Sequence, residues 1–105
     1  MAASGGGGAV DPFVLRLVTL CDAACESIRE APGCPDLGDS CSLTCTNDRI
    51  AALEIGCSFE PALDCADAHP ETVKSFCVDN TIKPVDAACD EVLAEYNACV
   101  LAASG

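Results

Sequence analysis

Large aromatic side chains are scarce in this sequence of 105 residues. It contains no tryptophan, and its aromatic residues are Phe13, Phe59, Phe76 and Tyr96. A core of alanine, valine, leucine and isoleucine buries little apolar area per residue, and at roughly 25 cal/mol per Å² it would barely offset the chain entropy lost on folding. Covalent cross-links, each contributing on the order of 2–4 kcal/mol, are therefore the expected source of further stability.

Basic residues are also few. Five lysines and arginines stand against 17 aspartates and glutamates, which gives a net charge of −12. Nucleic acids and anionic membranes attract proteins through lysine and arginine, so neither is an expected partner. We interpret the acidic surface as a solvated one, with a surface for cations or a basic partner as the alternative. No apolar run of about 18 residues occurs, so we expect no transmembrane segment.

Patterns that carry catalysis or bind metals are missing as well. The single histidine, His69, precedes Pro70 at a predicted helix end, and we interpret it as a surface residue. No Cys-x2-Cys motif occurs, which argues against a zinc knuckle and a thioredoxin-type redox site. The stretch 36–40 carries two aspartates but lacks the closing glutamate of a calcium loop. We therefore predict a protein that is not an enzyme, with no catalytic residues, no cofactor and no metal site.

Cysteine, in contrast, is abundant. Ten cysteines in 105 residues are typical of a disulfide scaffold, and disulfides persist in oxidising compartments. We therefore expect a secreted, periplasmic or cell-surface protein. The chain opens with Met1-Ala2-Ala3-Ser4-Gly5, without the basic and apolar segments of a signal peptide. A leader that is absent from this sequence is the favoured explanation, and a cytosolic role for the cysteines is the alternative.

Hydrophobic periodicity predicts one small all-α domain. Residues 1–10 read as a flexible Gly-rich tail, either native or a cloning remnant, and residues 11–103 as a single disulfide-rich helical domain. Three to four helices are expected, with a minor extended segment around Asp79-Asn80 that is either a short hairpin or a loop held by Cys77. The first predicted helix starts at Asp11-Pro12 and is ended by Pro32 and Gly33. The others cover roughly residues 40–55, 59–68 and 86–101, the last capped by Asp86.

Two Cys-x3-Cys motifs organise the first half of the chain. Cysteines four residues apart lie on one helix face, and a break at Ala31-Pro32-Gly33 separates the two motifs. If the two helices fold back antiparallel, one register brings both pairs of cysteines together. We predict the disulfides Cys21–Cys45 and Cys25–Cys41.

The remaining six cysteines allow several pairings. Cys89 and Cys99 lie ten residues apart, about 15 Å along a helix, so each must join that helix to a different element. Cys77–Cys89 would close the extended segment onto the last helix. We predict that pair and then, from the cysteines left over, the pairs Cys34–Cys65 and Cys57–Cys99.

The two motifs formed by Cys21, Cys25, Cys41 and Cys45 resemble those of the small Tim chaperones of the mitochondrial intermembrane space. In that family nested disulfides tie two helices, and rings of chains shield apolar precursors. Residues 20–101 as a whole, including Leu63-Asp64-Cys65 and Phe76-Cys77, resemble uncharacterised cysteine-rich exported domains of predicted bacterial lipoproteins. That resemblance implies export and a stapled helical fold, with no assigned activity.

These observations favour a non-enzymatic module that binds another protein or serves as a structural surface unit; self-association is also open. We expect a partner surface on the loops Pro35–Ser40 and Pro70–Pro84, because a stapled framework tolerates varied loops. Three alternatives stay open: a small apolar-ligand-binding protein, which would need an internal cavity; a Tim-like chaperone; and a secreted inhibitor or effector.

Overall fold

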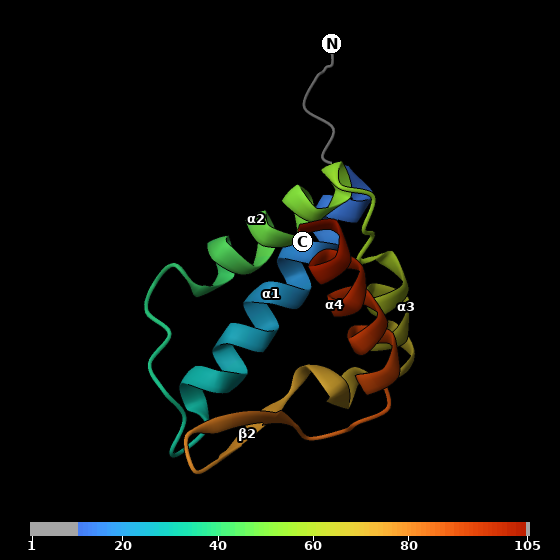
Figure 1. Cartoon of the computed structure of the whole chain (residues 1–105). Helices are drawn as coiled ribbons and strands as arrows, with labels where there is room; N and C mark the ends of the chain where they lie inside the picture. Colours follow the sequence, from blue (N-terminus) through green and yellow to red (C-terminus); the bar gives the residue numbers. More distant parts are fainter. Residues whose placement is uncertain (1–10, 105) are drawn as a thin grey trace.

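The computed structural model describes residues 11–104, and the predicted Gly-rich tail of residues 1–10 lies outside them. The described part is mostly helical, with four helices, one short 3-10 turn and a two-stranded antiparallel hairpin (Figure 1). This confirms the predicted fold class. The elements in chain order are α1 (Pro12–Glu30), α2 (Cys41–Glu54), α3 (Glu60–Ala68), η1 (Pro70–Val73), β2 (Ser75–Val78), β3 (Thr81–Pro84) and α4 (Asp90–Ser104).

Helix α1 is the longest element, and the other elements pack around it. Its start is fixed by Asp11, whose carboxylate accepts a hydrogen bond of 2.8 Å from the backbone N–H of Phe13, and by Pro12 in the first turn. Three of its residues are buried: Leu17, Cys21 and Cys25. Leu17 and Cys21 join a core cluster with residues of α3 and its N-cap, namely Phe59, Ala62 and Leu63.

Helix α2 continues without interruption through the polar stretch 46–48, and Thr46 of that stretch is buried. It ends in a Schellman motif. Gly56 has a positive φ of 84°, its N–H donates to the Leu53 carbonyl at 3.1 Å, and the N–H of Cys57 donates to the Ala52 carbonyl at 2.9 Å. This turn places Cys57 directly beneath the helix end, where it is 1% exposed.

Strands β2 and β3 form a hairpin around Asp79-Asn80, which is one of the two alternatives predicted for this segment. Val78 faces Thr81 across a two-residue turn, and both turn residues have positive φ, at 52° and 67°. That conformation belongs to the type I′ turn, which asparagine and aspartate tolerate and which matches the twist of the strands. One hydrogen bond ties the hairpin to α1: the backbone N–H of Ser75 donates to the hydroxyl of Ser27 at 2.9 Å.

Helix α4 starts four residues later than predicted. The carboxylate of Asp86 accepts a hydrogen bond of 2.9 Å from the N–H of Ala88 and so closes a local turn, while the helix itself begins at Asp90. Asp86 is therefore not the cap of this helix. Because the helix begins at Asp90, Cys89 lies at the end of the loop between β3 and α4, immediately before the first turn of the helix.

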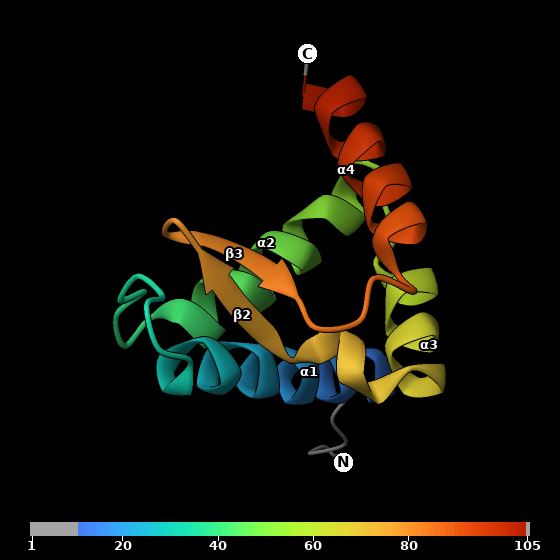
Figure 2. The ribbon, with the colours of Figure 1, turned by 90° about the horizontal axis from the view of Figure 1, so that it is seen from below.

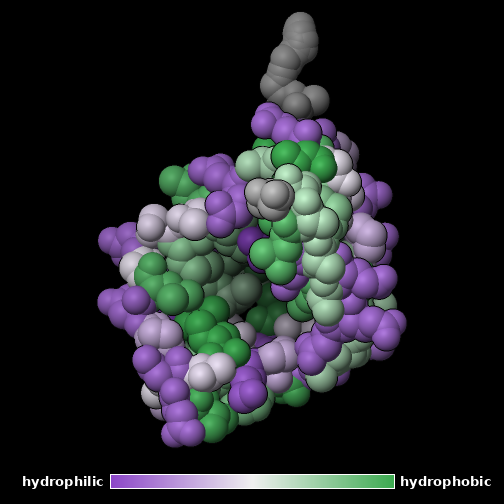
Figure 3. Space-filling model, in the orientation of Figure 1, coloured by the Kyte–Doolittle hydropathy of each residue, from purple (hydrophilic) through white to green (hydrophobic). Residues whose placement is uncertain are grey.

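The elements are arranged so that the molecule has a concave face. Helices α1 and α2 run antiparallel side by side, and the hairpin passes beneath the C-terminal end of α1 (Figures 1 and 2). Helices α3 and α4 lie at the other end of α1. In the space-filling view the face drawn in Figure 1 is hollowed between α2, α4 and the hairpin, and apolar side chains gather around the hollow (Figure 3).

Candidate functional site

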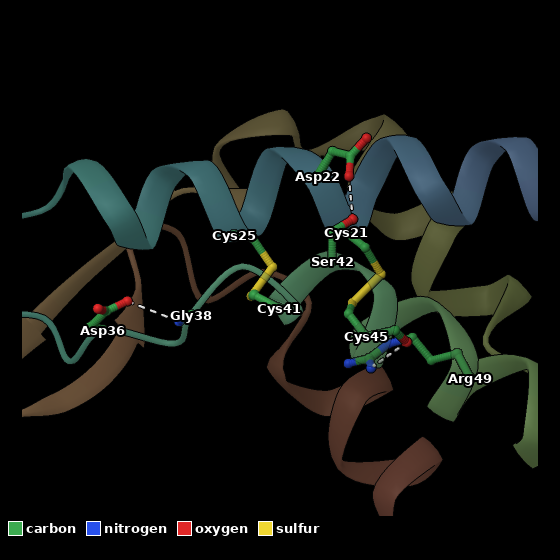
Figure 4. Close-up of a disulfide and its surroundings, with 9 residues drawn as sticks. All are labelled: Cys21, Asp22, Cys25, Asp36, Gly38, Cys41, Ser42, Cys45 and Arg49. Carbon is green, nitrogen blue, oxygen red and sulfur yellow. Dashed lines mark hydrogen bonds between the residues drawn. A yellow bond between two sulfur atoms is a disulfide. The ribbon is translucent and has the colours of Figure 1, made fainter.

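The α1–α2 pair is joined by two nested disulfides. Cys21 bonds Cys45 with the Cα atoms 5.8 Å apart, and Cys25 bonds Cys41 with the Cα atoms 6.1 Å apart (Figure 4). Both pairings match the sequence prediction. Between them the hydroxyl of Ser42 on α2 donates a hydrogen bond to the carboxylate of Asp22 on α1.

Helix α4 is joined to the rest of the domain near both ends. Cys99 bonds Cys57 with Cα atoms 5.9 Å apart, as predicted. Cys89 bonds Cys65 of α3 with Cα atoms 6.0 Å apart. The first link ties α4 to the turn after α2, and the second ties its start to α3.

Two predicted pairings are wrong. Cys34 bonds Cys77, with Cα atoms 5.2 Å apart, so neither the predicted Cys34–Cys65 nor the predicted Cys77–Cys89 disulfide exists. The path of the hairpin is the reason. Its turn points toward the C-terminal end of α1 and away from α4, which brings Cys77 to the loop that follows α1 (Figure 2). Cys65 is then left for Cys89.

A solvent-open groove of about 1000 Å³ lies between α1, α3, η1 and β2, and we refer to it as the α1–β2 groove. Its wall on α1 runs from Leu15 to Pro32, and β2 and η1 supply the opposite wall; Figure 2 shows these elements next to one another. Most of the lining is apolar, and the large apolar side chains in it are Leu15, Leu20, Leu63, Val73, Phe76 and Val85.

Several of these groove residues are exposed. Leu15 is 57% exposed, Phe76 43% and Val85 53%. Isolated exposed apolar residues are ordinary, but these converge on one concave surface, which is typical of a binding site. The predicted partner loop Pro70–Pro84 contributes Pro70 and residues 73–76 to the groove.

Charged side chains border the groove at both ends. Near the start of α1, Arg16 forms ion pairs with Asp64 at 2.8 Å and with Asp67 at 2.7 Å, both on α3. Hydrogen bonds to Asp64 and then Asp67 raise the pKa of Arg16 above its ordinary value. These ion pairs join α1 to α3 across one end of the groove.

The middle and far end of the groove carry a different set of charges. Lys74 pairs with Glu71 at 2.9 Å, three residues before it. Glu26 and Glu30 on α1 also line the groove, and within residues 11–104 no basic group lies within 4.0 Å of either carboxylate. The far end of the groove is therefore negatively charged.

A smaller depression of about 370 Å³ lies on the other side of the end of α1. It is lined by Cys25, Ile28, Arg29 and residues 34–38, with Cys41. Part of the second predicted partner loop, Pro35–Ser40, borders it. The carboxylate of Asp36 accepts a hydrogen bond of 2.9 Å from the N–H of Gly38, which fixes this loop locally (Figure 4).

Arg49 and Tyr96 pack around Phe59 where α2, α3 and α4 meet. The guanidinium of Arg49 lies 4.6 Å from the ring centroid of Phe59, and the Tyr96 ring meets that ring edge-on at 4.9 Å. Burial raises the pKa of Tyr96, and the charge of Arg49 partly offsets that effect. Sequence periodicity gave no sign that Arg49 would turn inward, because arginine is ordinarily assigned to a solvated face.

The described residues offer neither a free thiol nor a cluster of metal ligands. All ten cysteines are in disulfides, so none of them supplies a thiolate. Over residues 11–104 no group of three or more histidine, cysteine or acidic side chains is arranged to hold a metal ion. Over the same residues no helix combines the length and the hydrophobicity needed to cross a bilayer.

The fold and the groove define a small helical domain with five disulfides and an open, mainly apolar groove. No family model, no curated protein and no solved structure matches the chain.

Proposed function

We propose that this domain is a protein-binding module of an oxidising, extracytoplasmic compartment, secreted or exposed at the cell surface. The observation that carries this proposal is the α1–β2 groove, a solvent-open and mainly apolar concavity of about 1000 Å³. Five disulfides in one small domain support the compartment, because such bonds persist where thiols are not kept reduced.

Disulfides fix three of the four elements that line the groove. Cys21–Cys45 and Cys25–Cys41 fix α1, Cys34–Cys77 fixes β2, and Cys65–Cys89 fixes α3. A surface fixed before binding loses little conformational entropy when a partner arrives, which favours affinity. The disulfides are therefore consistent with a docking surface that is formed before the partner binds.

A polypeptide fits the groove better than a small apolar ligand does. Small-ligand sites enclose most of the ligand surface, whereas this groove is open and its rim residues Leu15 and Val85 are more than half exposed. Its wall on α1 from Leu15 to Pro32 is about 25 Å long, which accommodates a helix of roughly four turns.

Selection from a displayed peptide library tests the proposal. Ala23 is exposed on α1 and lines the groove, so Ala23→Trp would fill the groove without entering the core. Ala51→Trp, at an exposed position of α2 outside the groove, is the matched control. We expect selected peptides to bind the wild type and the control alike and to lose binding to Ala23→Trp. Equal binding to both variants, or no enrichment of any peptide, would overturn the proposal.

A further inference from the structure

Glu26 and Glu30 lie in an unfavourable electrostatic position on α1. They are four residues apart, so their carboxylates are neighbours on one helix face, and a like-charged pair at this spacing is destabilising. Glu30 also lies in the last turn of α1, where the helix dipole is negative and where Arg29 is the basic residue. Both are exposed and line the α1–β2 groove.

The other charged residues that line the groove have partners in the fold. Arg16 pairs with Asp64 and Asp67, and Lys74 with Glu71. Within residues 11–104, Glu26 and Glu30 have no such partner within 4.0 Å. A cationic group from outside would relieve their mutual repulsion and add to the favourable charge that Arg29 already places at the helix end.

We propose that the occupant of the α1–β2 groove is a basic amphipathic polypeptide segment. Its apolar side chains would contact Leu20, Leu63 and Phe76, and its lysine or arginine side chains would pair with Glu26 and Glu30. This inference rests on the proposed function, because it names the chemistry of the partner for the same groove. The net charge of −12 points the same way, since it attracts basic partners and repels acidic peptides and anionic lipid surfaces.

Three synthetic peptides test the chemistry of the occupant. Each has about 18 residues, with leucines on one helical face and with lysine, glutamine or glutamate on the other face. Calorimetry would measure their affinities at low and at moderate salt. We expect the lysine peptide to bind about tenfold more tightly than the glutamine peptide, with the difference shrinking as salt rises. The glutamate peptide should not bind.

Two double variants test whether the effect of charge on peptide binding comes from Glu26 and Glu30. The double substitution E26Q/E30Q should weaken binding of the lysine peptide by about tenfold, the sum of two exposed ion pairs. The control E54Q/E95Q removes the same charge from exposed positions outside the groove and should change the affinity by about twofold or less. Equal weakening in the two variants would show a general charge effect and overturn the inference.

Failure of the inference can be told apart from failure of the proposed function. If all three peptides bind equally and A23W abolishes their binding, the groove binds polypeptides and only the charge inference falls. If A23W leaves lysine-peptide binding unchanged, the groove is not the docking site and both proposals fall. Stronger binding to vesicles of phosphatidylglycerol than to the lysine peptide would assign the surface to lipid and overturn both.

Discussion

The α1–α2 pair and the β2–β3 hairpin are held in the domain by different means. Two disulfides one helical turn apart join α1 to α2, whereas a single disulfide, Cys34–Cys77, joins the hairpin to the rest of the chain. In the helical pair each cross-link partly duplicates the other. In the hairpin, one cross-link and the Ser75–Ser27 hydrogen bond hold a two-stranded ribbon that would be weak alone.

This contrast matters for binding because the groove has one wall in each region. The wall on α1 belongs to the doubly linked pair, and the wall on β2 belongs to the singly linked hairpin. Loosening the hairpin should therefore open the groove, while loosening α2 should leave both walls in place.

Removing the hairpin cross-link should have the largest effect. The residues of Cys34–Cys77 are separated by 43 positions, with no other disulfide shortening that loop much. The chain-entropy treatment then gives a loss of about 4 kcal/mol in the free energy of unfolding for C34A/C77A. Denaturant unfolding measures the loss, and hydrogen exchange should show reduced protection from Ser75 to Pro84. Unchanged exchange there would contradict the importance of this link.

Removing the Cys57–Cys99 disulfide should lower the free energy of unfolding somewhat less. Its sequence separation is 42, but Cys65–Cys89 already closes part of the same loop and leaves a ring of about 18 residues. For C57A/C99A we expect a loss of about 3 kcal/mol, with fraying confined to the C-terminal half of α4. Groove binding should survive, because α4 does not line the groove. Loss of peptide binding in this variant would contradict the assignment of the docking site to a groove that α4 does not line.

Removing one of the two nested disulfides should lower the free energy of unfolding least among these three variants. In C25A/C41A the Cys21–Cys45 bond still joins the helices one turn away, so the unfolded chain regains only the freedom of short segments. A loss of about 2 kcal/mol is expected in denaturant unfolding. A loss equal to that of C34A/C77A would show that the two nested bonds do not act redundantly.

The same contrast explains which disulfides could be predicted from the sequence. Cys21, Cys25, Cys41 and Cys45 are spaced by helix geometry, so local periodicity determines their register once an antiparallel pair is assumed. The partner of Cys77 depends instead on where the hairpin crosses α1. That path is set by tertiary contacts such as the Ser75–Ser27 hydrogen bond, which no local pattern encodes.

The groove was not predictable from hydrophobic periodicity either. Its α1 wall includes the face on which Arg16, Glu26 and Glu30 fall, and that face reads as solvent-exposed. One signal was present: Leu15 and Ala23 are apolar residues on this polar side, at positions eight apart. A stripe of this kind is weak evidence alone, because scattered apolar residues are common on protein surfaces.

A single hydrogen bond provides a finer comparison of the two regions. Ser27→Ala removes the acceptor of the partly buried Ser75 N–H and should lower the free energy of unfolding by about 1 kcal/mol. Ser42→Ala removes the hydroxyl that donates to Asp22 between the doubly linked helices. That carboxylate is exposed and regains water, so the loss should be smaller. Denaturant unfolding of both variants gives the comparison, and an equal or larger loss for Ser42→Ala would contradict it.

Tyr96 gives the smallest predicted effect, and it appears only at alkaline pH. Burial among α2, α3 and α4 raises its pKa above the ordinary value of 10.0, so the phenolate is less favourable in the folded than in the unfolded chain. The free energy of unfolding is therefore unaffected at pH values below the pKa of Tyr96 in the unfolded chain. It falls as the pH rises through that pKa toward the higher pKa of Tyr96 in the folded chain. Tyr96→Phe cannot ionise, so its melting temperature should fall less than that of the wild type between neutral and strongly alkaline pH. Thermal unfolding of both proteins across this range tests the sign, and parallel curves would show that Tyr96 does not contribute to the alkaline loss.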